Sequence, residues 1–489
     1  MLQNLMASIR ILLGNIYEQN VDFLWFFLSV LVTLAVLIPL INTLRMGKIP
    51  KEKERYKLSA PDPEIRDHAA KSLQMALNLR TAEKNPESLL RFRKMLEGRY
   101  PEIYKALSFD VYGAGSILFY WPSRTDEQGA PVVICSHYDL NPTKLENDNK
   151  NPDEYIEKSI ISGPDASGGI CSTIATLEAI DCLLKAGYAP TKRSIYFAFG
   201  HDGETGGQNG MFNITRMLFR KKINPVFVLY GSGNVYSFAN RNRFTASAAV
   251  GIAEKGRLRL KLTAFPVKSG KERTASEVLE EAVYRIESAP VKYRITETTR
   301  AYYRAMAPAL TFMGRFALGN LPFTKGLFYR IFRKEPESNP MLGTSIKISD
   351  KKIAQGEAFL DIGLINGDTA QYVRDYIGDI LSDLPVTIHE LEAVEASNIS
   401  ETGSEAYKSI CRAIQARFGR ILIAPCISDK PNGARYFEKI CGSVYRVSPV
   451  LLEARNYSEL DEDSVRDSAV GAAVETYISI IKSAGSDIL

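Results

Sequence analysis

Three short segments of the chain combine imidazole, carboxylate and glycine residues, which are the groups that build metal-dependent hydrolytic sites. They read SHYDLNP at 136–142, SGPDASGG at 162–169 and GHDGETGG at 200–207. His137 is followed two positions later by Asp139, so a metal ligand could be oriented by its own carboxylate partner. Asp165 and Glu204 add hard oxygen ligands of the kind that accompany imidazole on zinc. Each segment alone also suits a strand-end turn, but the three together predict a metal site.

The supply of other metal ligands is small. The 489 residues contain four histidines and six cysteines, and no two cysteines form a Cys-x-x-Cys pair. A zinc ribbon or a thioredoxin-type site is therefore not expected. Most of the cysteines lie in apolar runs, which predicts buried free thiols. Any metal site must rely on carboxylates with very few imidazoles.

The elements around these segments predict an α/β sheet. Short apolar runs typical of buried strands occupy 132–135, 194–199 and 225–230. Helical patterns occupy 65–79, 85–99, 170–186 and 209–219. Strands that alternate with helices form mostly parallel sheets, and the chemistry of such sheets gathers in the loops that follow the strands. The first and third segments occupy that position.

A second pattern begins near residue 249. Strands are expected at 257–265 and 358–365, and helices at 275–288 and 369–381. Strands and helices in this order predict a ferredoxin-like α+β module. The α/β pattern returns after residue 397, so the module interrupts one larger domain. The expected division is 64–248 and 395–489 for the α/β domain and 249–394 for the inserted domain.

Residues 296–340 of the inserted domain form an aromatic insert with basic residues between the rings. Its aromatic residues include Tyr302, Tyr303, Phe312, Phe316, Phe323, Phe328, Tyr329 and Phe332. Such a segment can form a local core. It can equally face a membrane or a partner protein, because mixed apolar and basic surfaces are suited to both.

The N-terminal region predicts one transmembrane helix. Residues 23–44 contain no charged residue, and at about 1.5 Å per residue they are long enough to cross a hydrocarbon core of about 30 Å. A buried core helix and a cleaved signal peptide are the alternatives. An amphipathic segment at 1–22 and a charged linker at 45–63 flank the helix. Because basic residues dominate the C-terminal flank, the large domain is expected in the cytoplasm.

The composition excludes several classes of protein. With 45% hydrophobic and 24% charged residues, the chain is neither a disordered tail nor a small module held by disulfides. Its net charge of +5 is small for this length, so a nucleic-acid partner is not expected.

The order and context of the motifs resemble the co-catalytic zinc metallopeptidase family of carboxypeptidase S, aminoacylase, acetylornithine deacetylase, succinyl-diaminopimelate desuccinylase and glutamate carboxypeptidase. The carboxypeptidase S-type branch is the most similar. The resemblance rests on VICSHYDLNP, ISGPDASGGI, RSIYFAFGHDGETGG, EKGRLRLKL and GARYFEKICGSVYRVSPV. It implies a phosphorylase/hydrolase-like α/β catalytic domain with an inserted lid or dimerisation domain, which could form a homodimer. It also implies two zinc ions, and peptides or N-acyl amino acids as ligands.

Carried over by position, the resemblance implies roles for five residues. His137 matches a zinc ligand, and Asp139 matches the carboxylate that orients it. Asp165 matches the ligand that bridges the two zinc ions, and Glu204 matches a ligand of the other zinc. Arg435 matches an arginine that helps to hold the substrate near its carboxylate.

Other positions depart from the family pattern. Gly203 stands where the family has its general base, and loss of such a base typically lowers the rate by about 10² to 10⁴. Tyr230 and Arg455 stand where the family has two further zinc ligands. The region 265–270 contains no match to the oxyanion histidine of the lid, and Gly433 stands where the family has an aspartate.

These departures favour a degenerate member that is impaired in catalysis and binds a peptide, an acylated amino acid or a partner protein. An active hydrolase with a rebuilt one- or two-zinc site is the alternative, and an unrelated α/β domain is the third interpretation. Substitute ligands for a rebuilt site would come from Glu453, Glu459 and Asp461. If the metal is lost, the guanidinium of Arg455 is expected to pair with Asp165 or Glu204.

Overall fold

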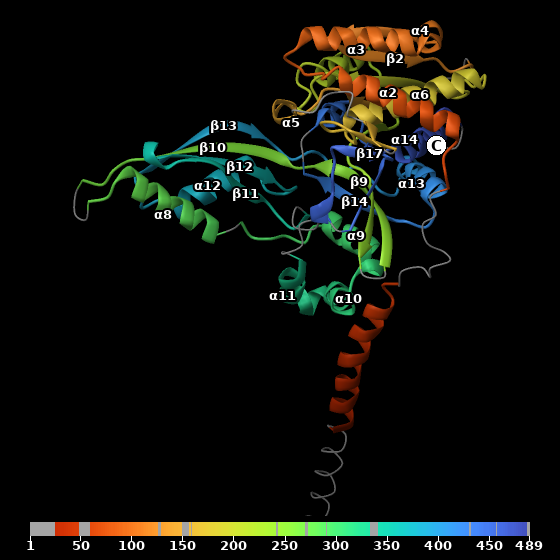
Figure 1. Cartoon of the computed structure of the whole chain (residues 1–489). Coiled ribbons are helices and arrows are strands. Elements are labelled where there is room, and N and C mark those ends of the chain that lie inside the picture. Colours follow the sequence, from red (N-terminus) through yellow and green to blue (C-terminus); the bar gives the residue numbers. More distant parts are fainter. Residues whose placement is uncertain are drawn as a thin grey trace, which may run out of the picture. The chain divides into compact units, whose positions relative to one another are not determined.

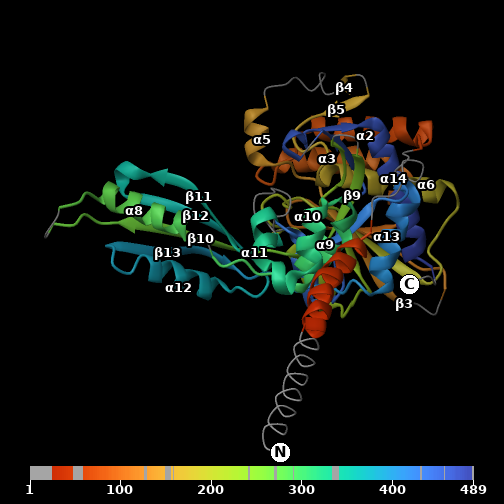
Figure 2. The same cartoon turned by 90° about the horizontal axis from the view of Figure 1, so that it is seen from below.

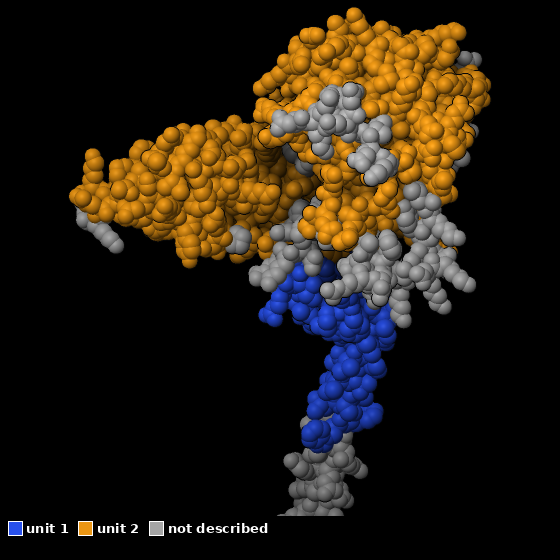
Figure 3. Space-filling model, in the orientation of Figure 1, with its two compact units in different colours: residues 1–49, 306–334 blue, residues 50–305, 335–489 orange. Residues whose placement is uncertain are grey.

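The computed structural model describes residues 25–47, 59–125, 129–148, 156–157, 159–240, 243–268, 272–289, 291–332, 341–429, 432–455 and 457–486. The chain divides into two compact units (Figure 3), formed by residues 1–49 with 306–334 and by residues 50–305 with 335–489. The predicted amphipathic segment 1–22 and most of the predicted linker 45–63 lie outside the described residues.

The larger unit is built on a mixed sheet with ten strands among the described residues. Its order is β1-β2-β6-β3-β7-β15-β9-β8-β16, and β14 pairs with β9. The strands are β1 (Ser108–Tyr112), β2 (Ser116–Trp121), β3 (Gly129–His137), β6 (Arg193–Gly200), β7 (Val228–Tyr230), β8 (Val235–Asn240), β9 (Arg243–Glu254), β14 (Leu422–Ser428), β15 (Val444–Arg446) and β16 (Leu451–Ala454). Because β3 pairs in parallel with β6 and β7, His137, Gly200 and Tyr230 end their strands at one edge of the sheet.

Helices cover both faces of this sheet (Figure 1). One layer contains α2 (Pro63–Asn78), α3 (Pro86–Arg99), α6 (Gly169–Lys185), α13 (Glu405–Phe418) and α14 (Asp467–Ala484), and the other contains α7 (Met211–Arg220) and the 3-10 helix η6 (Gly433–Lys439). Side chains alternate along a strand, so Val132 and Ile134 of β3 pack in the first layer while Val133 and Cys135 pack in the second. The predicted α/β architecture is confirmed, and the ends of the predicted helices are displaced by at most two residues.

A second sheet in the larger unit forms the inserted module. Its elements follow the chain as β10 (Gly256–Ala264), α8 (Ala275–Ser288), β11 (Ser345–Lys352), β12 (Glu357–Leu364), α12 (Ala370–Ile380) and β13 (Val386–Val394). The antiparallel order β11-β12-β10-β13 is the ferredoxin-like order. The two helices lie along the sheet (Figure 2). They pack on it through one apolar core, in which β10 buries every second side chain. Its use as a lid or dimerisation domain stays a prediction.

The smaller unit contains the predicted apolar helix and part of the aromatic insert. The helix covers Trp25–Leu44, and the insert contributes α10 (Phe312–Gly319) and α11 (Leu321–Phe332). All side chains from Trp25 to Ile38 are exposed, which disagrees with the alternative of a buried core helix. By length and composition the helix could cross a membrane. The contacts thus group 306–334 with the apolar helix, whereas the sequence-based division placed this segment in the inserted domain.

All six cysteines are free. Cys135, Cys171 and Cys441 are buried, as predicted, and the other three are partly buried. Burial raises the pKa of the Cys171 thiol to about 12, so this thiol stays protonated at neutral pH.

Candidate functional site

The imidazole of His137, the last residue of β3, lies at the centre of the site and is 7% exposed. Its Nδ1 is 3.1 Å from the hydroxyl of Tyr230, and its Nε2 is 3.1 Å from Oε1 of Glu204 in the loop after β6. Burial lowers the pKa of His137, but the hydrogen bond with Glu204 and the charges of nearby carboxylates outweigh burial and raise this pKa to about 9. Both ring nitrogens are therefore engaged by protein groups, and the neighbouring carboxylates favour the protonated ring.

Two glycines leave room for this ring. A Cβ at Gly203 would lie 2.2 Å from Cγ of His137, and a Cβ at Gly169, the first residue of α6, would lie 2.3 Å from its Cε1. Both distances are far below van der Waals contact. The change at position 203 is therefore more than the removal of one base, because the imidazole fills the space that any side chain at this position would need.

Asp139 is buried and holds the loop that carries Glu204. Its Oδ1 accepts a hydrogen bond from the backbone N–H of Gly203 at 2.7 Å, and its Oδ2 accepts one from the N–H of Glu204 at 2.9 Å. Burial raises the pKa of Asp139 to about 7. The sequence predicted that Asp139 orients His137, but in the structure it positions the 203–204 loop, because backbone donors take its oxygens while other groups take the imidazole nitrogens.

Asp165, the predicted bridging ligand, is bound to an ammonium group. The Nζ of Lys144 lies 2.6 Å from Oδ1 of Asp165 and 2.7 Å from Oδ1 of Asp463. Lys144 lies on α5 (Pro142–Asn147), and Asp463 directly precedes β17 (Ser464–Arg466). Burial lowers the pKa of Lys144, but the hydrogen bonds to the two carboxylates raise it overall. The ammonium therefore stays charged at neutral pH and balances the charge of Asp165.

Asn141 connects the two halves of the cluster. Its side-chain Nδ2 donates to Oε2 of Glu204 at 3.1 Å, and its backbone N–H donates to Oδ2 of Asp165 at 3.0 Å. Its Oδ1 also caps the first turn of α5, which presents Lys144 to Asp165. The three predicted ligand positions are therefore brought together.

Sequence reasoning missed Asn141, Lys144 and Asp463 as members of this cluster. Asn141 was visible in the first segment, and Lys144 follows it by three positions. The signal for Asp463 was weaker: it lies two residues after Asp461, which was considered only as a substitute ligand.

The expected pairing of Arg455 is wrong. Arg455 is exposed and forms no ion pair with Asp165 or Glu204 among the described contacts. The physical reason is that the ammonium of Lys144 already neutralises Asp165, while Arg455 is exposed to solvent. The proposed substitute ligands are also engaged elsewhere, since Glu453 pairs with Arg466 at 3.3 Å and Asp461 accepts hydrogen bonds from residues 463 and 464.

Arg435, the predicted substrate-binding residue, is bound to other protein groups. Its Nη2 donates to the backbone oxygen of Glu395 at 2.6 Å, and its Nε lies 3.9 Å from Oε1 of the buried Glu254. Glu254 also pairs with Arg446 at 3.2 Å. The guanidinium thus belongs to a buried charge network at the end of β9, and its predicted contact with a substrate carboxylate stays a prediction.

The donor set does not fit a two-zinc centre. Within the described ranges, no group of three or more His, Cys, Asp or Glu side chains could hold a metal ion. Zinc sites usually need at least three protein ligands. Asp165 faces an ammonium, His137 is engaged at both nitrogens, and burial raises the pKa of Tyr230 well above its usual range, so its hydroxyl stays protonated.

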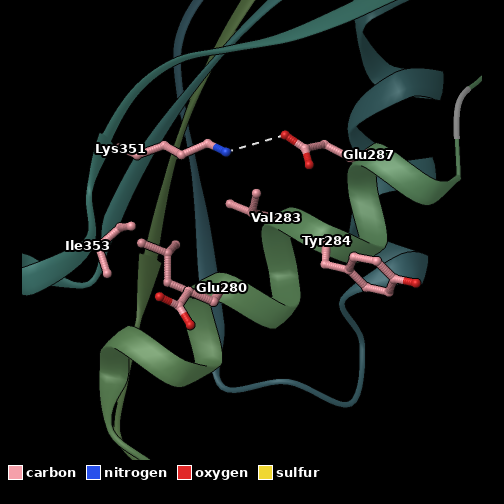
Figure 4. A pocket seen from close by; sticks show the side chains of 7 residues that line it. Glu280, Val283, Tyr284, Glu287, Lys351 and Ile353 are labelled. Carbon is pink, nitrogen blue, oxygen red and sulfur yellow. Dashed lines mark hydrogen bonds and ion pairs between the residues drawn. The ribbon is translucent and has the colours of Figure 1, made fainter.

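Two hollows of the larger unit lie outside this cluster. The first has a volume of about 160 Å³ and lies between α8 and β11, with Lys351 and Glu287 paired at 3.3 Å across it (Figure 4). The second also has a volume of about 160 Å³ and lies beside β16 and β17. Neither hollow is lined by His137, Asp165 or Glu204.

Comparison with known proteins gives the following relatives. No protein-family model matches the chain. It is 25% identical over 390 residues to the probable carboxypeptidase S-like 2 of Dictyostelium discoideum, covering 76% of this chain and 74% of that protein. It is 23% identical over 494 residues to the N-fatty-acyl-amino acid synthase/hydrolase PM20D1 of Xenopus tropicalis, covering 94% of each.

Solved structures share the fold. The M20 family metallo-carboxypeptidase Sso-CP2 of Sulfolobus solfataricus matches with a TM-score of 0.58 at 13% identity, over 85% of this chain and 99% of that chain. Human carnosine dipeptidase 1 matches with a TM-score of 0.58 at 13% identity, over 87% of this chain and 99% of that chain.

Proposed function

We propose that this chain, a relative of the carboxypeptidase S-type M20 metallopeptidases, is a membrane-anchored binding protein that has lost metal-dependent hydrolysis. The ligand class we propose is the peptides and N-acyl amino acids, in which an amide bond lies next to a free carboxylate. The names of the relatives support this class, because they are carboxypeptidase S-like proteins and N-fatty-acyl-amino acid synthase/hydrolases.

One observation carries the proposed loss of hydrolysis: the ammonium of Lys144 lies 2.6 Å from the carboxylate of Asp165. An ammonium can balance the charge of that carboxylate as a metal would. It cannot act as a Lewis acid on a carbonyl oxygen or lower the pKa of a bound water as a metal does. Gly203 supplies no general base, so a second group on which metal-assisted amide hydrolysis depends is also missing from its family position.

The experiment uses the full chain in detergent, with zinc added, against a panel of dipeptides and N-acyl amino acids. We expect no hydrolysis above the buffer rate, and binding of at least one panel member in a calorimetric titration. Zinc-dependent hydrolysis that disappears in Asp165→Asn would contradict the proposal. The Asp165→Asn variant is needed because a contaminating peptidase would be unaffected by it.

The second candidate is an amide hydrolase with a rebuilt metal site. It is favoured by Asn141, which joins Asp165 to Glu204 and so keeps the predicted ligand positions within one cluster. Under this candidate, zinc would have to displace Lys144 from Asp165. The activity panel separates the two candidates directly.

Membrane anchoring through the helix Trp25–Leu44 is part of the proposal. It is supported by the apolar length of the helix and by the exposure of its side chains. Basic residues that follow the helix, beginning with Arg45, favour a cytoplasmic location of the large domain. An alkaline carbonate wash of cell membranes should leave the full chain in the pellet, and its release into the supernatant would contradict anchoring.

A further inference from the structure

We propose that α10 and α11 form a hairpin that lies in the interfacial layer of an anionic bilayer, beside the end of the apolar helix Trp25–Leu44. This inference rests on the proposed membrane anchoring. It concerns residues 306–334, which belong to the smaller unit and not to the unit that contains His137, Asp165 and Glu204. These residues include five basic and no acidic side chains, together with six aromatic rings.

The hairpin packs on the C-terminal end of the apolar helix (Figure 1). Asn320, between α10 and α11, is 3% exposed. Its Nδ2 donates to the backbone oxygen of Pro39 at 3.2 Å, and its Oδ1 accepts from Nδ2 of Asn42 at 3.2 Å. Paired amides of this kind join helices in an apolar environment, where an unpaired amide would be costly.

A close backbone approach supports the same contact. A Cβ at Gly319 would lie 3.3 Å from the backbone carbonyl group of Asn42 and 3.4 Å from Cε of Met46. Further along, Arg315 donates to the backbone oxygen of Gly47 at 3.1 Å. The hairpin therefore contacts only the last turns of the helix, from Pro39 onward, among the contacts described.

This position sets the depth of the hairpin. If the span ends near Leu44, contact at Pro39 lies about 7.5 Å inside that end, at about 1.5 Å per residue. Interfacial helices bury their apolar face about 5–10 Å into the boundary between headgroups and acyl chains. The depth of the contact at Pro39 falls within this range. The hairpin is therefore placed at the boundary between headgroups and acyl chains.

The hairpin also presents the side chains that such a layer accepts. Phe312, Met313 and Phe323 are 48%, 50% and 90% exposed, although all three are large and apolar. Exposed apolar side chains of this kind mark surfaces that bind a partner or a membrane. The basic side chains, including the exposed Lys325, complement anionic phospholipid headgroups at about 1 kcal/mol for each cation near the surface. A bilayer explains both features at once.

The test uses full-length protein in vesicles of phosphatidylcholine and phosphatidylglycerol that contain lipids brominated near the headgroup or deep in the acyl chain. The chain has two tryptophans, Trp25 on the apolar helix and Trp121 in the core of the larger unit, where it is 4% exposed. In the double variant Trp25→Phe with Phe323→Trp, we expect the new tryptophan to lose emission more to the shallow bromines than to the deep ones. Trp25→Phe alone should show no quenching, because only the buried Trp121 remains.

The wild-type chain separates this inference from the anchoring on which it rests. Quenching of Trp25 without quenching at position 323 would keep the anchor and overturn the hairpin proposal. A blue-shifted but unquenched emission at 323 would overturn it in favour of a protein partner or a second copy. Phe219, 61% exposed on α7, is the matched control. Equal quenching of Phe219→Trp would indicate non-specific adsorption and would also overturn the proposal.

Discussion

Lys144 is the residue on which the chemistry of the cluster depends. Its ammonium contacts Asp165 and Asp463, and its side chain is 31% exposed. Ion pairs with this much access to solvent contribute little to stability, so we assign Lys144 a role in charge balance. While it occupies Asp165, a metal would have to break a charge-assisted pair before it could bind.

Replacement of Lys144 by an uncharged residue should increase the affinity of the protein for zinc. In Lys144→Met, the carboxylate of Asp165 loses its ammonium partner and becomes available to a metal. We expect zinc to raise the melting temperature of Lys144→Met but not that of the wild type or of Lys144→Arg, which keeps the positive charge. Identical responses of the three proteins in a thermal denaturation assay would show that Lys144 does not exclude the metal.

Restoring a side chain at position 203 should damage the fold without restoring catalysis. The Cβ of Gly203→Ala would collide with the buried ring of His137, and overpacking of this kind costs about 1–3 kcal/mol. We expect a matching decrease in the free energy of unfolding, measured in urea, and no hydrolysis by Gly203→Glu. Gly98 on α3 is the control: a Cβ there would meet no atom within 4 Å, so Gly98→Ala should be neutral or stabilising. Equal effects at the two glycines would contradict the proposed packing.

At the scale of elements, the sequence predicted those helices and strands whose apolar residues follow a clear pattern. The strands around 132–135 and 194–199 were predicted because their apolar runs are continuous and are followed by turn residues, and the helices beside them because their apolar residues recur at helical spacing. The strand β9 was missed because its alternation is weak: the residues that face the core at 246, 248, 250 and 252 include two alanines, and alanine and glycine also stand between them. Short strands such as β15, which is three residues long, give a pattern too brief to recognise.

The hairpin of α10 and α11 also makes a prediction at this scale. Asn320→Ala removes the hydrogen bonds to Pro39 and Asn42, and we expect a loss of about 1–3 kcal/mol for the partner groups left unsatisfied. Hydrogen exchange of residues 312–332 in vesicles should therefore be faster in this variant. Lys94→Ala changes an exposed side chain of α3, outside the hairpin, and should leave exchange unchanged. Unaltered exchange in Asn320→Ala would contradict the packing of the hairpin on the apolar helix.

At the scale of the whole molecule, the sequence predicted the α/β fold and the inserted ferredoxin-like module, and it placed His137, Asp165 and Glu204 in one site. The cation that balances Asp165 could not be predicted, because Lys144 lies 21 residues from Asp165 and 319 residues from Asp463 in the chain. Local patterns do not reveal such a pair. The same reason explains why Arg455 was proposed as the compensating cation: the sequence required a positive charge but did not locate it.

The metal content of the full chain tests the central claim most directly. The protein should be purified in detergent, loaded with excess zinc, desalted and measured by elemental analysis together with Lys144→Met. We predict almost no zinc on the wild type, because Asp165 is paired with an ammonium and the donors of His137 are engaged. Tightly bound zinc at about one or two ions per wild-type chain would contradict the account and favour an active metallohydrolase.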